Sequence, residues 1–111
     1  MIEQVRPADW DAWLQAQDAR PLVLDVREPW ELHTASVTPR EFDLLAVPMN
    51  EVPARLAELP ADRPIACLCH HGMRSQRVAL FLAQRGYTGV VNVAGGIDAW
   101  SREHDSSVPV Y

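Results

Sequence analysis

The residues of this chain that could carry out chemistry gather in one short segment, Cys69-His70-His71-Gly72-Met73-Arg74-Ser75. The segment follows an apolar run typical of a buried strand and precedes a helical pattern. Ligands of open α/β sheets bind at such strand ends. Gly72 supplies the small residue that the turn needs. Backbone N–H groups of such a turn form an anion-binding nest, and the positive end of the following helix adds to it. We therefore expect an anion site here.

Cys69 is the nucleophile that this segment would activate. A thiol at the mouth of an anion nest should be deprotonated near neutral pH, because helix N-termini and cationic neighbours stabilise a thiolate. Arg74 is the cationic neighbour, and His70 and His71 adjoin the cysteine. Since the thiolate is the nucleophilic form, this arrangement predicts a reactive Cys69. Cys67 lies inside the strand, where a cysteine is usually a small core residue.

Two other kinds of chemistry stay open for this cluster. Cysteine and histidine are zinc ligands, so both cysteines and the adjacent His70 and His71 could bind a metal ion. Adjacent histidines seldom converge on one ion and no second ligand cluster follows, so we expect no metal site. Cysteine phosphatases use a similar loop with five residues between Cys and Arg, whereas four separate Cys69 from Arg74. The shorter loop suits a sulfur atom and is tight for a tetrahedral phosphate.

The charge of the chain is unevenly distributed. Ten arginines and lysines oppose 15 acidic residues, for a net charge of −5, which argues against a nucleic-acid partner. No acidic residue lies in the segment 63–97, which contains Arg63, Arg74, Arg77 and Arg85. Chance and a buried centre could produce this pattern. The alternative is a cationic mouth around Cys69 that attracts small anions, and this is our expectation.

The elements that must position this segment alternate between strands and helices. Expected strands are 2–5, 22–26, 45–48, 64–68 and 90–93. Expected helices are 7–14, one that begins at Asn50 and places Val52, Leu56 and Leu59 on one face, 75–85 and 97–103. Such alternation indicates a parallel α/β sheet with helices on both faces.

One strand carries an anomaly. Asp25 stands in the apolar run 22–26, and a buried carboxylate needs partners. Arg27, two residues later, is the obvious candidate. Residues 33–44 form a polar excursion with no clear element.

The length and composition favour one domain spanning residues 1–111. The chain has 111 residues and is 48% hydrophobic, which is enough for a real core. No apolar run approaches the ~18–20 residues that a membrane span needs, so no membrane partner is expected. The N-terminus lacks the pattern of a secretory signal. Two cysteines one residue apart would close a strained ring, so we expect reduced thiols and a cytoplasmic protein.

Four segments together resemble the rhodanese family of single-domain sulfurtransferases. They are Leu24–Pro29, Val47–Met49, Cys69–Ser75 and Asn92–Trp100. The resemblance implies a five-stranded parallel sheet flanked by helices and a ping-pong sulfur transfer without a cofactor. Cys69 would take a sulfur atom from thiosulfate or a thiol persulfide and pass it, as a persulfide, to cyanide or a thiol. A sulfur-acceptor protein is a further partner that the resemblance allows.

The resemblance also implies roles for individual residues. Backbone N–H groups of residues 70–75 would hold the persulfide, and Arg74 would attract the anion. Asp25 and Arg27 would brace the loop from a neighbouring strand end. Rhodanese-like domains also serve as non-catalytic interaction or regulatory modules, so this alternative remains. The family's Gly-His-Ile-x-Gly-Ala segment has no clear match here, which leaves residues 33–45 and the role of His33 undefined.

Overall fold

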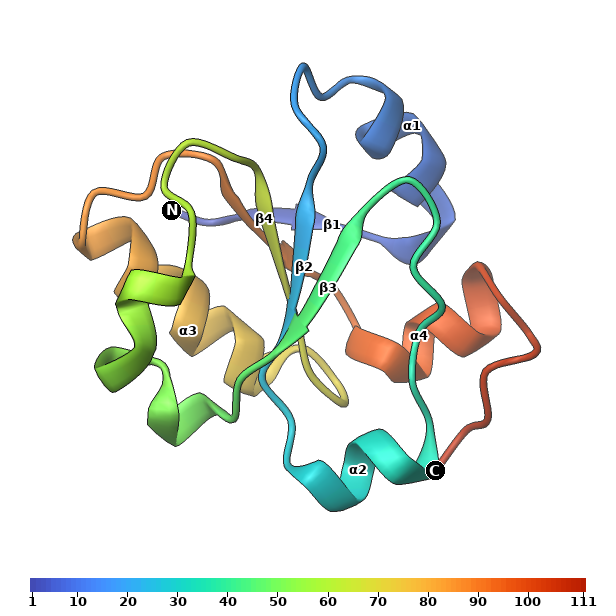
Figure 1. Cartoon of the computed structure of the whole chain (residues 1–111). Coiled ribbons are helices and arrows are strands. Elements are labelled where there is room, and N and C mark those ends of the chain that lie inside the picture. The colour runs from blue at the N-terminus through green and yellow to red at the C-terminus, as the bar shows by residue number, and fades with distance from the viewer.

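The computed structural model describes residues 1–111 and centres on one five-stranded sheet in which every neighbouring pair is parallel (Figure 1). Its strands are β1 (Glu3–Val5), β2 (Leu22–Asp25), β3 (Asp43–Ala46), β4 (Ile65–Leu68) and β5 (Val90–Val93). They lie in the order β1-β5-β4-β2-β3, so β4 is central. Because the strands are parallel, their carboxyl ends share one edge, and Cys69 follows the central strand there.

Helices cover both faces of this sheet. They are α1 (Trp10–Gln15), α2 (Pro29–Thr34), α3 (Met73–Gln84) and α4 (Gly96–Glu103), with 3-10 helices η1 (Pro7–Asp9), η2 (Met49–Glu51) and η3 (Pro53–Glu58). α3, η2 and η3 lie on one face, and α1 and α4 lie on the other (Figure 1). α2 lies instead beyond the carboxyl edge of the strands. The predicted α/β architecture, with a five-stranded parallel sheet and helices on both faces, is confirmed.

The alternation of side chains along β4 divides the core into two layers. Cys67 and Cys69 belong to the layer under α3. Ala66 and Leu68 belong to the opposite layer, which contains Trp10 of α1 and Trp100 of α4. Residues two apart on an extended strand point to the same face. The cysteine that begins the loop therefore emerges on the side of the sheet where α3 starts.

Two predicted elements differ from the structure. The helix expected from Asn50 is replaced by the two short 3-10 helices η2 and η3, and no side-chain cap forms at their starts. The helical conformation begins at Met49, and a continuous α-helix from there would need an N–H of Pro53 to donate to the Met49 carbonyl, which proline lacks. The backbone of Arg55 also departs from helical angles. The strand expected at 45–48 begins two residues earlier, at Asp43. No helix in the structure has both the length and the apolar character needed to cross a membrane.

Candidate active site

Cys69 lies between the end of β4 and the start of α3, with its side chain turned inward. The residue is 1% exposed. The Gly72 backbone N–H donates to Cys69 Sγ at 3.1 Å, and the Ser75 hydroxyl lies 3.2 Å from the same atom. Gly72 has φ +101°, a left-handed conformation that glycine adopts without strain, and it immediately precedes α3. The loop therefore places the sulfur atom next to a backbone N–H donor and a hydroxyl group at a helix N-terminus.

Asn92 of β5 fixes this loop from the neighbouring strand. Its Oδ1 lies 2.6 Å from Ser75 Oγ, and its Nδ2 donates to the Gly72 carbonyl at 3.1 Å. The same Nδ2 donates to Gln4 Oε1 of β1 at 2.9 Å. Sequence analysis did not single out Asn92. The available signal was a polar residue in an otherwise apolar strand, where a buried amide needs partners.

The N-terminus of α4 holds the loop from another direction. The Ile97 N–H donates to the Cys69 carbonyl at 2.8 Å, and the Asp98 N–H donates to the His70 carbonyl at 3.1 Å. A Cβ on Gly96 would lie 2.5 Å from the Cys69 carbonyl oxygen and still closer to that of His70. Only glycine lets α4 approach the loop this closely.

Arg74 is not a free cation, because it forms a two-bond ion pair with Glu31 of α2. Its NH1 donates to Glu31 Oε1 at 2.7 Å and its NH2 to Oε2 at 2.9 Å. Glu31 is only 3% exposed. Hydrogen bonds from Arg74 are the main reason that the pKa of Glu31 falls to about 2. Hydrogen bonds from the Glu28 N–H and the Tyr111 hydroxyl lower this pKa further, whereas burial opposes the fall.

The sequence predicted Arg74 as a cationic neighbour of Cys69 that attracts an anion, and it gave no sign of the pairing with Glu31. No local pattern pairs two residues 43 positions apart, so only the fold reveals this contact. The pKa of Arg74 is raised, mainly by Glu31, and negative charge at Cys69 adds to the rise. The guanidinium therefore lies against the Glu31 carboxylate. A guanidinium has five N–H donors, and Glu31 uses two of them.

The predicted partnership of Asp25 and Arg27 is present and buried. Arg27 Nε lies 2.9 Å from Asp25 Oδ1, and NH2 lies 2.7 Å from Oδ2. Arg27 also donates to the Ala35 carbonyl at the end of α2 and to the Tyr111 hydroxyl, both at 2.9 Å. None of its hydrogen bonds goes to residues 70–75. The pair thus reaches the loop only indirectly, through α2 and Tyr111.

The remaining loop side chains differ in exposure. His70 is half-buried and its Nε2 lies 2.7 Å from the Tyr111 carbonyl oxygen, whereas His71 and Met73 are exposed. Burial raises the pKa of the Cys67 thiol, and the neighbouring Cys69 adds to the rise, so Cys67 stays neutral in the core. The structure brings together no group of three or more His, Cys, Asp or Glu side chains that could hold a metal ion. His33 is exposed on α2 and does not contact the loop.

Comparison with known proteins gives the family. A family model described as a rhodanese-like domain matches residues 7–103. The chain belongs to the rhodanese-like domain family. A protein of Allochromatium vinosum named sulfurtransferase is 38% identical over 81 residues, which cover 73% of this chain and 72% of that protein. The resemblance inferred from the four sequence segments is confirmed.

Two more relatives extend the comparison. A maize protein named adenylyltransferase and sulfurtransferase MOCS3-1 is 34% identical over 100 residues, covering 86% of this chain but only 21% of that protein. The crystal structure of a rhodanese-related protein from Thermoplasma volcanium has a TM-score of 0.76 and 33% sequence identity, with 91% of this chain and 92% of that chain covered. The relationship therefore holds in both sequence and backbone.

The arginines of segment 63–97 do not gather around Cys69 in this rhodanese-like domain, which corrects the expectation of one cationic mouth. Arg63 precedes β4, at the opposite edge of the sheet, and pairs with Asp43. Arg85 follows the far end of α3 and packs over Phe81. Only Arg74 and Arg77 lie near the loop. The segment 63–97 has no acidic residue but reaches both edges of the sheet, because β4 leads to the carboxyl edge and α3 returns in the opposite direction.

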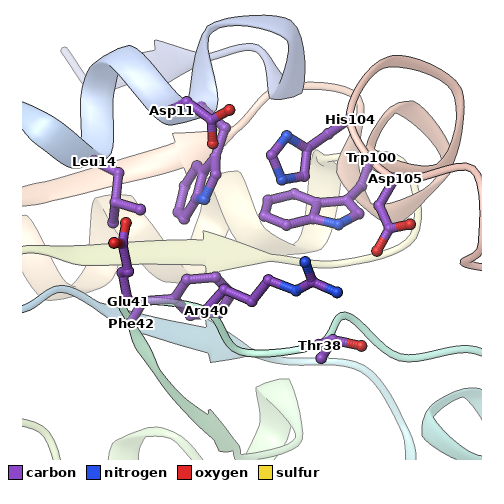
Figure 2. Close-up of a pocket in the computed structure, with 10 residues that line it drawn as sticks. Asp11, Leu14, Thr38, Arg40, Glu41, Phe42, Trp100, His104 and Asp105 are labelled. Carbon is purple, nitrogen blue, oxygen red and sulfur yellow. The ribbon is translucent and has the colours of Figure 1, made fainter.

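The largest cavity of the rhodanese-like domain lies away from Cys69. It has a volume of about 480 Å³ and opens on the face covered by α1 and α4 (Figure 2). Trp100 and Phe42 lie at its base, and Arg40, His104 and Asp105 lie around it. No residue from 69 to 75 lines it. A smaller cavity of about 360 Å³ lies against the loop, where His71, Gly72, Met73 and Arg77 line it.

Proposed function

We propose that this protein is a sulfurtransferase that carries a sulfane sulfur as a persulfide on Cys69. The donor is thiosulfate or a thiol persulfide, and the acceptor is cyanide, a small thiol or a thiol on an acceptor protein. The observation that carries the proposal is the Cys69 sulfur atom, which accepts from the Gly72 N–H and lies beside the Ser75 hydroxyl at the N-terminus of α3. A helix N-terminus stabilises a negative charge on sulfur.

The reaction has two displacement steps. The Cys69 thiolate attacks the outer sulfur of thiosulfate, the sulfur–sulfur bond of the donor breaks, and sulfite leaves with the electron pair. With a thiol persulfide as donor, the leaving group is the thiolate. The acceptor then attacks the outer sulfur of the Cys69 persulfide, and the Cys69 thiolate leaves. Electrons balance within each step, so no redox cofactor is required.

The surrounding residues would bind either the sulfur donor or the persulfide intermediate. Backbone N–H groups of residues 70–75 hold the terminal sulfur of the persulfide, in the way that the Gly72 N–H already holds Cys69 Sγ. Arg74 attracts the anionic donor with N–H groups that Glu31 leaves free. Asp25 and Arg27 support the loop through α2. The names of the Allochromatium and maize relatives support the reaction class.

Three further expectations belong to the proposal. Residues 1–111 act as one domain, the two thiols stay reduced, and the protein works in the cytoplasm. The 2 cysteines are both free in the structure, which supports the second of these.

Intact-protein mass after incubation with a sulfur donor tests the proposal. Wild type and Cys67→Ala should each gain one sulfur atom, and Cys69→Ser should gain none. A hydroxyl is a far poorer nucleophile and cannot carry the sulfane sulfur. Cys67→Ala is the matched control, because it removes the other thiol from the same strand. Its packing loss should be about 1 kcal/mol.

Two outcomes would contradict the proposal. If a folded Cys67→Ala protein gains no sulfur, the two thiols act together and the single-nucleophile mechanism is wrong. If wild type gains no sulfur from thiosulfate or from thiol persulfides, the protein belongs with the non-catalytic modules of its family.

A further inference from the structure

Tyr111 connects the two halves of the candidate site. Its hydroxyl donates to Glu31 Oε2 at 2.7 Å and accepts from Arg27 NH1 at 2.9 Å. Its ring stacks on His70, with centroids 3.9 Å apart and planes 4° apart. Its carbonyl oxygen lies 2.7 Å from His70 Nε2. One residue thus contacts the buried arginine, the carboxylate that holds Arg74, and the loop that contains Cys69.

We propose that Tyr111 is a positioning residue for sulfur transfer, which fixes the Arg74 guanidinium, through Glu31, where it can bind an anionic sulfur donor. The inference rests on the proposed function and adds a specificity determinant to it. Tyr111 touches neither Cys69 nor the expected place of the donor, so its effect passes through its neighbours.

The hydrogen bonds of Glu31 show how this positioning works. Oε1 accepts from the Glu28 N–H at 3.1 Å and from Arg74 NH1, and Oε2 accepts from Arg74 NH2 and the Tyr111 hydroxyl. Each oxygen is therefore held by one bond in addition to its bond with Arg74. These two extra bonds fix the plane of the carboxylate. The two-bond pairing then fixes the plane of the guanidinium and the direction of its free N–H groups.

The ionisation of Tyr111 suits a donor role. Burial raises the pKa of the phenol, and the charge of Glu31 raises it further, while Arg27 lowers it. The phenol is therefore protonated at neutral pH. The hydroxyl accepts from Arg27 and donates to Glu31, so it connects a buried cation to a buried anion. Arg27 can only donate and the Glu31 carboxylate can only accept, so the directions of both hydrogen bonds are fixed.

Tyr111→Phe isolates the hydroxyl, since it keeps the ring that stacks on His70. The matched control is Tyr87→Phe. The Tyr87 hydroxyl also makes two hydrogen bonds, to the carbonyls of Leu59 at 2.9 Å and Leu56 at 3.3 Å, but it lies beyond the far end of α3. Both variants lose a phenolic oxygen, so a difference in their activity reflects where the hydroxyl lies relative to the site.

The first readout is the rate of Cys69 alkylation by iodoacetate divided by the rate with iodoacetamide. The two reagents differ mainly in charge, so the ratio measures how well the site attracts an anion, and it needs no sulfur transfer. We expect Tyr111→Phe to lower this ratio, and kcat/KM for thiosulfate, by about three- to tenfold, the effect of one hydrogen bond. The KM for thiosulfate should rise while kcat changes little, and Tyr87→Phe should change neither.

The second readout is a double-mutant cycle with Arg74→Ala. If Tyr111 acts through Arg74, then Tyr111→Phe should have no further effect on the ratio once the guanidinium is gone. Full additivity of the two changes overturns action through Arg74. An unchanged ratio in the Tyr111→Phe single variant overturns the positioning role altogether. If the ratio responds as expected but wild type takes up no sulfur, the proposed function fails and the positioning of Arg74 stands.

Discussion

At the residue scale, Arg74 pairs with Glu31 through two of its five N–H groups, and the proposed function assigns the anionic donor to the N–H groups that stay free. Glu31 is buried and charged, so it needs Arg74 for its own stability in the fold. An anionic donor would need the same side chain for binding. The N–H groups that Glu31 leaves free allow both interactions, and the ion pair holds them in a fixed direction. Substitutions at Arg74 and Glu31 should therefore affect stability as well as activity.

Arg74→Ala should lower kcat/KM for thiosulfate by about one to two decades, because a charge-assisted hydrogen bond contributes roughly 1.5–3 kcal/mol. The variant should also unfold at lower urea concentration, since Glu31 loses two of its four hydrogen bonds. Steady-state kinetics and urea unfolding measure the two effects. Arg55→Ala is the control, because Arg55 pairs with Glu51 and Glu58 on an exposed surface. Activity of Arg74→Ala within about twofold of wild type would make Arg74 a bystander.

Glu31 should give the protein a specific acid sensitivity. Its pKa is about 2 in the folded chain against an ordinary 4.5, chiefly because of Arg74. A carboxyl with a lowered folded-state pKa stabilises the fold above pH 4.5, and this stabilisation is lost as the pH falls from about 4.5 towards 2. The contribution is on the order of 3 kcal/mol.

Glu31→Gln should remove this component. The difference in the free energy of unfolding between wild type and Glu31→Gln should be constant above pH 5 and shrink below pH 4.5, as urea unfolding across that range would show. Glu58→Gln is the control, since Glu58 also pairs with an arginine but lies exposed. A difference that does not depend on pH would show that Glu31 is not ionised against Arg74 in the folded protein.

At the element scale, two helices meet the loop with their N-termini. α3 begins directly after Gly72, and α4 begins at Gly96 with N–H groups bonded to the carbonyls of Cys69 and His70. The carbonyl oxygens of Cys69 and His70 are thereby held on α4, and the Gly72 N–H of the same loop donates to the sulfur. The close approach depends on the missing side chain of Gly96.

Gly96→Ala should displace the loop and lower both stability and transfer. The added Cβ would overlap the Cys69 and His70 carbonyls, so the free energy of unfolding should fall by about 3 kcal/mol or more. Gly86→Ala is the control: Gly86 also has a positive φ, but nothing lies within 4 Å of its Cβ position. Backbone strain at Gly86→Ala should lower the free energy of unfolding by about 1 kcal/mol and leave sulfur loading unchanged. Equal effects at both positions, measured by thermal unfolding and intact mass, would contradict close packing at Gly96.

At the scale of the whole molecule, the net negative charge and the arginines near the loop have opposite effects on an anionic donor. The net charge of −5 repels anions at long range. Near the loop, Arg77 is exposed and forms no ion pair, and Arg74 is largely compensated by Glu31. The two other arginines of the acid-free segment lie at the opposite edge of the sheet. Long-range attraction of the donor should therefore be weak.

Ionic strength should consequently change the rate only slightly. Salt screens both the general repulsion and the local attraction, and the two changes act in opposite directions. We expect kcat/KM for thiosulfate to vary by less than about twofold as the Debye length falls from about 30 Å to about 10 Å. Stopped-flow or steady-state assays over this range measure it. A steep fall of kcat/KM with rising salt would support the cationic mouth around Cys69 that the sequence predicted.

The local signals of the chain were sufficient for the fold and for the position of the loop that begins at Cys69. Buried apolar runs fixed the strands of the sheet, and Gly72 between a strand and a helix located the turn at Cys69. The partnership of Asp25 and Arg27 was predictable because the two residues are neighbours in sequence. The helix expected from Asn50 was wrong, since the prolines of that segment favour short 3-10 helices.

Contacts between distant residues could not be read in the same way. Glu31 with Arg74, Asn92 with Ser75, and Tyr111 with His70 join elements far apart in the chain. The prediction of a cationic mouth failed for the same reason, because one strand or one helix separates the arginines of segment 63–97 and carries them to opposite edges of the sheet. The sequence by itself determined that Cys69 begins a turn between a buried strand and a helix, since strand, turn and helix are local features. The tertiary structure alone decided which carboxylate, amide and phenol surround that turn, because parallel strands bring to one edge the residues that follow each of them.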